Sequence, residues 1–78
     1  MSEATQARAW REANRLTRKE LAGLTGYAPE TIYLFEHGTN SRGEPHPKDS
    51  WKRYKLACLA VATLLHYKVA SVEEWQWS

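Results

Sequence analysis

Apolar residues recur at helical spacing along much of the chain. Trp10, Ala13 and Leu16 lie three residues apart, and Ile32 and Phe35 repeat that interval, so each set falls on one face of a helix. No segment alternates apolar with polar residues over the length of a strand. The pattern therefore predicts an all-α fold, a compact bundle of about five helices.

Capping residues predict where one of these helices begins and ends. Thr17 and Glu20 have the spacing of a capping box, in which the threonine hydroxyl accepts from the backbone amide three residues on and the glutamate reaches back. The helix is therefore expected to begin near Arg18. It is expected to end at Gly26, because glycine readily takes the left-handed conformation that terminates helices.

A second short helix is predicted only three residues later. Pro29 fits its first turn, where the missing N–H of proline is not needed, and Gly38 is expected to end it. Two short helices this close form the corner of a helix-turn-helix, whose second helix can enter the major groove of DNA. The residues expected in the core where the helices cross are Leu21, Ala22, Ile32 and Phe35.

A polar stretch with two prolines follows the second short helix. Residues 39–49 are expected to form a loop, which Pro45 and Pro47 keep extended. Asp49 or Ser50 is predicted to cap a long fourth helix.

The C-terminal part of the chain contains a helix that is expected to be covered by protein on two sides. Residues 56–62 are apolar on every side, so the helix needs cover from two directions. Ser71 and Glu74 repeat the capping-box spacing and predict a last short helix from Val72. Residues 50–78 are therefore expected to form a homodimer interface as well as part of the single domain 1–78, although Trp75 can instead fold over its own core. The residues predicted at the interface are Leu59, Leu64, Leu65, Trp75 and Trp77.

A set of matched residues gives the first half of the chain a family resemblance. The matched residues are Trp10-Arg11-Glu12, Leu16-Thr17, Glu20-Leu21-Ala22, Gly26, Thr31-Ile32, Glu36 and Gly38. Residues 5–38 thereby resemble the lambda-repressor-like helix-turn-helix family, the Cro and XRE type, in the short form found in phages and mobile elements. The likeness continues weakly through residues 70–74.

The resemblance implies how the second short helix meets DNA. It implies base contacts from Pro29, Glu30, Tyr33 and Leu34, with Thr31 near a phosphate. Glu30 can accept from cytosine N4 and Leu34 can pack on a thymine methyl group. Two alternatives stay open: Glu30 can serve only the helix dipole, and Tyr33 and Leu34 can contact protein.

The resemblance also implies a partly buried ion pair between Arg11 and Glu36. Such a pair orients the helices that carry it more than it stabilises them.

Charge is concentrated in the middle of the chain. Residues 1–39 have no net charge, whereas residues 40–68 hold six basic and two acidic residues, a net charge of +4. This segment is expected to face phosphates, although lysines on a solvated helix are also ordinary. Arg42 can reach a phosphate or bind guanine through two hydrogen bonds. The residues predicted to contact phosphates are Thr17, Arg18, Lys19, Thr31, Asn40, Lys48, Lys52 and Arg53; of these Asn40 can equally serve a turn.

Other chemistry finds little support in the sequence. The single cysteine, Cys58, cannot form an internal disulfide, and three scattered histidines do not make a zinc site. No nucleophile has a partner at motif spacing and no glycine-rich phosphate loop is present, so neither an enzyme nor a cofactor or small-molecule ligand is expected. Without a signal peptide or an apolar run long enough to span a membrane, the chain is expected in the cytoplasm of a bacterial or phage-infected cell, at the nucleoid.

These patterns together predict a DNA-binding transcription regulator, a repressor or autorepressor. It is expected to bind a palindromic operator in double-stranded DNA as a homodimer, through the major groove. The alternative is a protein-interaction module, an antitoxin or anti-activator, that uses the same fold.

Overall fold

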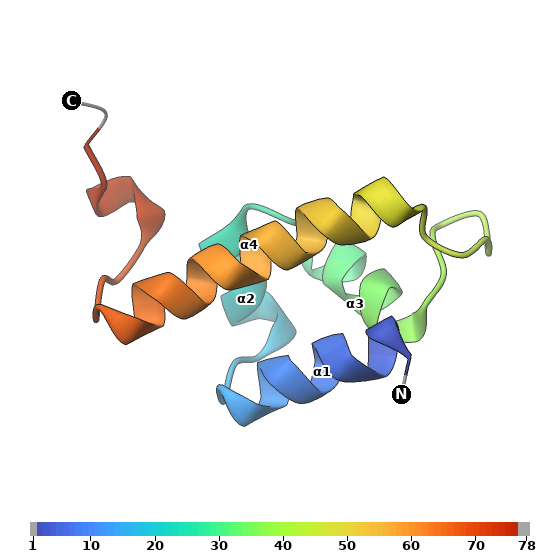
Figure 1. Cartoon of the computed structure of the whole chain (residues 1–78), viewed down its shortest axis with the longest axis horizontal. Helices are drawn as coiled ribbons and strands as arrows, with labels where there is room; N and C mark the ends of the chain where they lie inside the picture. The colour runs from blue at the N-terminus through green and yellow to red at the C-terminus, as the bar shows by residue number, and fades with distance from the viewer. Residues whose placement is uncertain (1, 77–78) are drawn as a thin grey trace.

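The structure is a computed structural model that describes residues 2–76. Its four α-helices are, in chain order, α1 at Glu3–Ala13, α2 at Arg18–Thr25, α3 at Pro29–His37 and α4 at Lys48–His66 (Figure 1). A single 3-10 turn, η1 at Val72–Glu74, follows them. Residues 2–76 contain no strand, only an isolated bridge between Thr39 and Pro45. The predicted all-α class is confirmed, with four α-helices rather than five.

The expected fifth helix is only this 3-10 turn. The Ser71 side chain makes no capping hydrogen bond, and the Glu74 carboxylate instead accepts from the backbone N–H of Ala70 at 3.2 Å. Trp75 is already extended, with φ −76° and ψ 137°. So short a turn has too few internal hydrogen bonds to offset the cost of starting a helix.

The start of α4 also differs from the expectation. The helix begins at Lys48, and the residue at its N-cap is Pro47, with no side-chain capping bond. The predicted cap at Asp49 or Ser50 is therefore wrong. Pro47, at φ −59°, has no backbone N–H, so it leaves no donor to be satisfied at the start of the helix. Asp49 lies in the first turn, where a carboxylate interacts favourably with the helix dipole.

The boundaries of the two short helices are confirmed. The Glu20 amide donates to Thr17 Oγ1 at 3.0 Å and the Thr17 amide donates to Glu20 Oε1 at 2.9 Å, so the capping box is complete. Gly26 and Gly38 end α2 and α3 with φ of 86° and 81°, and Pro29 opens α3.

The first helix is shorter than the apolar spacing suggests. It ends at Ala13, and Arg15 is left-handed with φ 57°. Leu16 consequently lies outside the helix, yet it still packs against the core.

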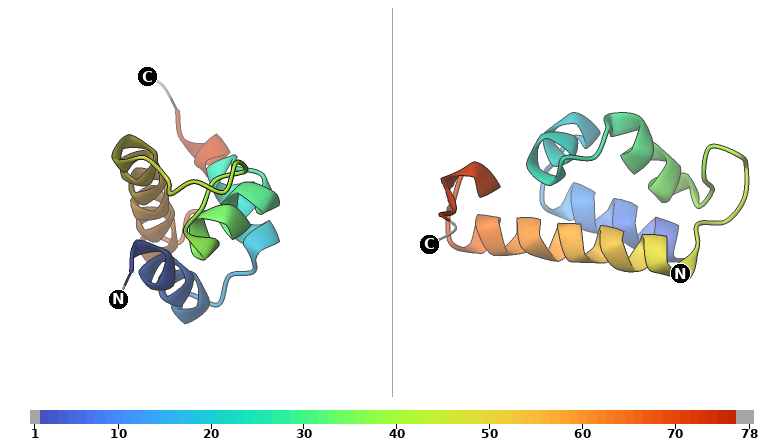
Figure 2. Two further views of the ribbon diagram at one scale, coloured as in Figure 1. Left: turned by 90° about the vertical axis from the view of Figure 1, so that its right-hand side faces the viewer. Right: turned by 90° about the horizontal axis from the view of Figure 1, so that it is seen from above.

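The helices form two layers around one core. Views from two further sides show α1 and α4 together in one layer and α2 and α3 in the other (Figure 2). The predicted core positions of α2 and α3 are buried, and α4 adds the two side chains that complete the core. The core residues are Leu21, Ala22, Ile32, Phe35, Tyr54 and Val61.

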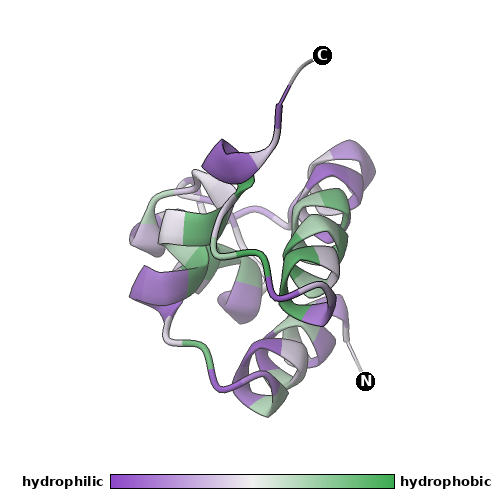
Figure 3. Cartoon of the chain, turned by 90° about the vertical axis from the view of Figure 1, so that its left-hand side faces the viewer, coloured by the Kyte–Doolittle hydropathy of each residue, from purple (hydrophilic) through white to green (hydrophobic). Residues whose placement is uncertain are grey.

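The fourth helix is apolar around much of its circumference, as Figure 3 shows by colour. Tyr54 and Val61 are buried, but Leu56 and Leu59 are 57% and 63% exposed. The fold therefore covers α4 on one side only. None of the helices in residues 2–76 is both long enough and apolar enough to cross a membrane.

Candidate nucleic-acid interface

A three-residue turn fixes how α3 follows α2. Gly26, in its left-handed conformation, donates its N–H to the Ala22 carbonyl at 2.9 Å. The Thr25 hydroxyl donates to the Leu21 carbonyl at 2.8 Å and accepts from the Tyr27 amide at 3.2 Å. These hydrogen bonds lie within the turn and the end of α2, so they fix the shape of the turn locally.

A buried carboxylate ties three helices together. Arg11 Nε lies 2.6 Å from Glu36 Oε2, and Arg11 Nη2 donates to Glu36 Oε1 at 3.0 Å. Arg11 Nη1 also donates to the Leu16 carbonyl at 2.7 Å, and Arg18 Nε lies 3.2 Å from Glu36 Oε1. Glu36 therefore links α3 to both α1 and α2, and the structure brings Arg11 and Glu36 together in the position that the resemblance implied.

Neighbouring arginines stabilise the ionised form of Glu36. Burial pushes the pKa of its carboxyl upward, but the hydrogen bonds and charge of Arg11, with those of Arg18, outweigh burial and hold the pKa below its usual value of 4.5. The carboxylate is ionised in the folded protein, so both arginines keep a counter-charge.

This lowered pKa predicts that acid destabilises the fold. A carboxyl whose pKa is lower in the folded than in the unfolded chain contributes its full stabilisation above the unfolded value, and loses it as the pH falls through the folded value. We therefore expect the free energy of unfolding, measured in urea, to fall progressively below about pH 4.5. In Glu36→Gln the part of this fall that belongs to Glu36 should disappear; an unchanged pH profile would contradict the assignment.

Aromatic side chains hold the loop after α3 against the helix. His46 stacks on Phe35 with ring centroids 4.1 Å apart, and its Nε2 is 3.0 Å from the Leu34 carbonyl oxygen. Trp51 meets Phe35 edge-on at 5.0 Å, and Tyr54 stacks on Phe35 at 4.2 Å. The loop and the start of α4 are consequently positioned relative to α3.

The outward side of α3 carries the residues predicted to read bases. Pro29 and Glu30 are exposed, as is Tyr33 at 45%, whereas Thr31 and Leu34 are half-buried. The Tyr33 ring is stacked on His37 at 3.8 Å, and the Arg18 guanidinium lies 5.2 Å from the ring centroid. Tyr33 is thus presented at the surface in a restrained orientation.

The loop beside α3 is ordered by Asn40. Its Oδ1 accepts from the backbone amides of Arg42 and Glu44 at 2.9 and 3.0 Å. The Asn40 side chain therefore serves the turn, which was the alternative to the predicted phosphate contact. The Arg42 side chain is 80% exposed and its Nε lies 3.2 Å from Glu44 Oε1, so the loop after α3 displays a guanidinium that is paired with Glu44.

The basic residues do not form one group. Thr17 caps α2 and Lys19 is exposed in its first turn, whereas Arg18 turns inward to Glu36. On α4, Lys48 and Lys52 share an exposed side of the helix with Leu56, in the layer away from α3. Arg53, one turn before Ala57, lies on the side of α4 that faces α2.

The residues predicted for the dimer interface are accessible in the single chain, within the described range. Leu59, Leu65 and Trp75 are 63%, 41% and 57% exposed, and Leu64 is half-buried. The prediction for Trp77 lies outside the described residues. Leu56, at 57% exposed, lies one turn before Leu59 and was not singled out from the sequence, although it begins the same apolar run.

Two further roles are visible only in the structure. Arg18 serves Glu36, which spacing along the chain could not reveal because the two residues are eighteen positions apart. His46 has no motif around it that indicates a contact with α3.

Within residues 2–76, no three side chains of His, Cys, Asp or Glu are grouped so that they could hold a metal ion.

Comparison of the chain with protein-family models, with curated proteins and with solved structures finds no match.

Proposed function

We propose that α2, the turn and α3 form a helix-turn-helix, and that the protein is a regulator of transcription that binds double-stranded DNA by placing α3 in the major groove. One observation carries the proposal: Glu36 and the aromatic cluster hold the inner side of α3 against the core, while its outer side and Arg42 in the loop after it stay exposed. A rigid helix with an accessible face is what groove reading requires.

The exposed chemistry of α3 favours a particular kind of readout. Glu30 offers an acceptor for cytosine N4, and Leu34 offers an apolar contact for a thymine methyl group. Pro29 and Tyr33 shape the rest of the surface. Since α3 contains no arginine or lysine, positive charge must come from neighbouring elements.

Three exposed cations lie on elements other than α3. Lys19 stands at the start of α2, Arg42 in the loop and Arg53 on α4. The free amides at the N-terminus of α2 add a further site for a phosphate. This arrangement supports phosphate binding on both sides of a groove, with affinity that falls steeply as salt rises.

The experiment that tests the proposal is selection of binding sites from random DNA duplexes at about 0.1 M salt, near physiological screening. We expect one sequence to be enriched by the wild-type protein and lost with Tyr33→Ala, while Arg8→Gln, on the exposed side of α1, leaves it unchanged. A folded wild-type protein that enriches no sequence would refute DNA reading, and would favour the alternative of a protein-interaction module with the same helices.

Glu30→Gln is expected to change which base is preferred. A carboxylate accepts from cytosine, whereas a glutamine amide can both accept from and donate to adenine. Repeating the selection with this variant should move one position of the site from cytosine toward adenine. If the preferred base stays the same, Glu30 serves only the helix dipole.

We further propose that the chain binds DNA as a two-fold dimer through the exposed side of α4 and the segment after it. Two copies would place their α3 helices about 34 Å apart, one turn of DNA, and the selected site would be a palindrome. Bound at a promoter, such a dimer would act as a repressor or autorepressor.

The dimer predicts that stability depends on protein concentration. Raising the concentration from about 1 to 100 µM should raise the melting temperature by roughly 5–10 °C. Leu65→Glu, which places a charge on the proposed interface, should remove that dependence. Ala9→Glu, the same kind of change on exposed α1, should keep it. A melting temperature of the wild type that does not move with concentration would contradict dimerisation.

A further inference from the structure

The outer side of α3 continues past Tyr33 to His37, the last residue of the helix. His37 is exposed, and it follows Tyr33 by four residues and Glu30 by seven, which places the three residues on one side of the helix. Because α3 contains no arginine or lysine, His37 is the residue of this helix that can acquire a positive charge.

One ring nitrogen of His37 is held by the protein and the other is accessible. Nδ1 lies 2.8 Å from the Tyr33 carbonyl oxygen, and the His37 ring stacks on the Tyr33 ring with centroids 3.8 Å apart. A carbonyl can only accept, so Nδ1 carries the hydrogen of this bond in both the neutral and the protonated ring. Nε2 makes no hydrogen bond within residues 2–76. Protonation therefore turns Nε2 from an acceptor into a charged donor without breaking the bond that holds the ring.

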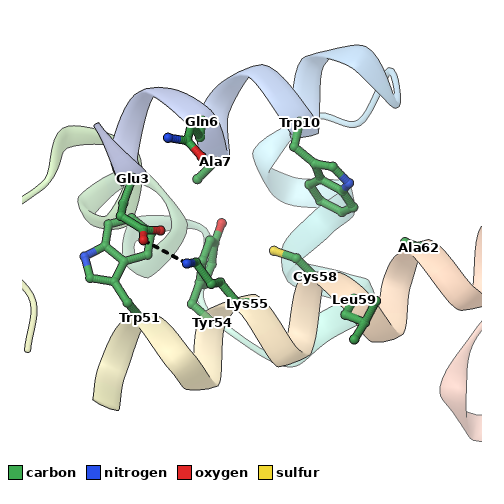
Figure 4. Close-up of a pocket in the computed structure, with 10 residues that line it drawn as sticks. All are labelled: Glu3, Gln6, Ala7, Trp10, Trp51, Tyr54, Lys55, Cys58, Leu59 and Ala62. Atoms are coloured by element: carbon green, nitrogen blue, oxygen red, sulfur yellow. Dashed lines mark hydrogen bonds and ion pairs between the residues drawn. The ribbon is translucent and has the colours of Figure 1, made fainter. Parts of the chain in front are cut away.

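Charged residues on the neighbouring elements are already paired. Arg18 on α2 lies 5.2 Å from the centroid of the Tyr33 ring and is bound to Glu36. The start of α1 is also close, because a Cβ placed on Gly38 would lie 3.6 Å from Ala4 Cβ. The ion pairs of α1 and of the loop after α3 are Glu3 with Lys55 (Figure 4), Arg8 with Glu12, Arg11 with Glu36, and Arg42 with Glu44. The carboxylates of these two elements thus have cations of their own, and a protonated His37 can take its counter-charge from a ligand.

The other histidine near α3 is held differently. His46 Nε2 lies 3.0 Å from the Leu34 carbonyl oxygen, the His46 ring stacks on Phe35, and the side chain is half-buried. Its ring is therefore turned to the protein and serves the position of the loop. Protonation of His46 is a background effect that variants of His37 leave in place.

We propose that His37 is a further DNA contact, which binds a backbone phosphate through Nε2 when its imidazole is protonated. The inference rests on the proposed placement of α3 in the major groove, where the N-terminal residues of such a helix contact base edges. His37 lies about 10 Å further along the helix than Glu30, close to the groove width of about 12 Å, so it reaches the edge of the groove. A phosphate favours the charged imidazole. Binding therefore takes up a proton, and affinity for DNA rises as the pH falls.

The test is fluorescence anisotropy with the selected duplex at about pH 5.5 and about pH 8, on two sides of the range in which histidine changes its charge. In 0.1 M salt the wild-type protein should bind about 5- to 8-fold more tightly for each bound chain at the lower pH. The slope of log affinity against log salt should be steeper there by about 0.9 for each bound chain. His37→Gln, which carries no charge, should show the weaker affinity and the shallower slope at both pH values.

Two further variants serve as controls. His37→Arg has a permanent charge and a planar group that can still stack on Tyr33, so it should show the stronger affinity and the steeper slope at both pH values. Arg15→Gln removes an exposed charge just after α1, at the opposite end of that helix from Ala4. This variant should keep the pH dependence of the wild type.

The possible failures are distinguishable. A pH dependence that persists unchanged in His37→Gln would overturn the inference and assign the proton uptake to another histidine. A wild-type protein that binds its selected duplex equally well at both pH values would overturn it as well, and would leave DNA reading by α3 intact. If the selection enriches no duplex, DNA reading fails and the contact of His37 fails with it.

Discussion

Glu36→Leu is expected to lower the free energy of unfolding by about 3–5 kcal/mol. The change removes the counter-charge of Arg11, which is 8% exposed, and an unpaired buried charge is among the costliest defects in a protein. A domain of 78 residues has a total stability of about 4–12 kcal/mol, so the variant should be close to unfolding. Urea titration followed by circular dichroism measures the loss.

The matched control removes both charges. Arg11→Met with Glu36→Leu places apolar side chains of similar size in the same space, and replacing a whole buried pair is often close to neutral. Arg18 keeps access to water in this variant because its side chain is 34% exposed. We expect the double variant to recover most of the lost stability. If it is as unstable as Glu36→Leu alone, the pair is itself a net source of stability rather than a device that orients the helices.

Neutralising Lys19, Arg42 and Arg53 together is expected to weaken DNA binding by roughly 500-fold for each bound chain at 0.1 M salt. Each phosphate contact that is lost removes about 0.9 from the slope of log affinity against log salt, so the three contacts should lower the slope by about 2.7 for each bound chain and by about 5.4 for the proposed dimer. The measurement is fluorescence anisotropy with the selected duplex over a series of salt concentrations. Glutamine at each position keeps the length of the side chain and removes its charge.

The control carries the same change of charge elsewhere. Arg8→Gln, Arg15→Gln and Lys55→Gln alter exposed residues on α1, just after it and on the side of α4 that meets α1, so affinity and salt slope should change little. Equal losses in both triple variants would mean that net charge, not the surface around α3, governs binding. Arg42→Ala alone then separates two roles: a uniform loss over all sequences indicates a phosphate contact, and a relaxed preference at one position indicates guanine.

Local signals explain why the short helices were predictable. The capping box of Thr17 and Glu20, and the left-handed glycines at 26 and 38, act within a few residues, so spacing alone reveals them. The same logic failed for Ser71 and Glu74, because a cap stabilises a helix only if enough residues follow it. At Pro47 it failed because a helix can begin without a side-chain cap.

The sequence by itself determined the all-α class, the bounds of α2 and α3, and the core residues between them, because helical period and capping chemistry are local properties. Only the tertiary structure decided that Arg18 turns to Glu36, that the side of α4 with Arg53 faces α2, and that the Tyr54 hydroxyl is buried with no hydrogen-bond partner of ordinary geometry among the described residues. Those outcomes depend on how helices distant in sequence pack, and burial then sets the cost of every charge and hydroxyl that packing encloses.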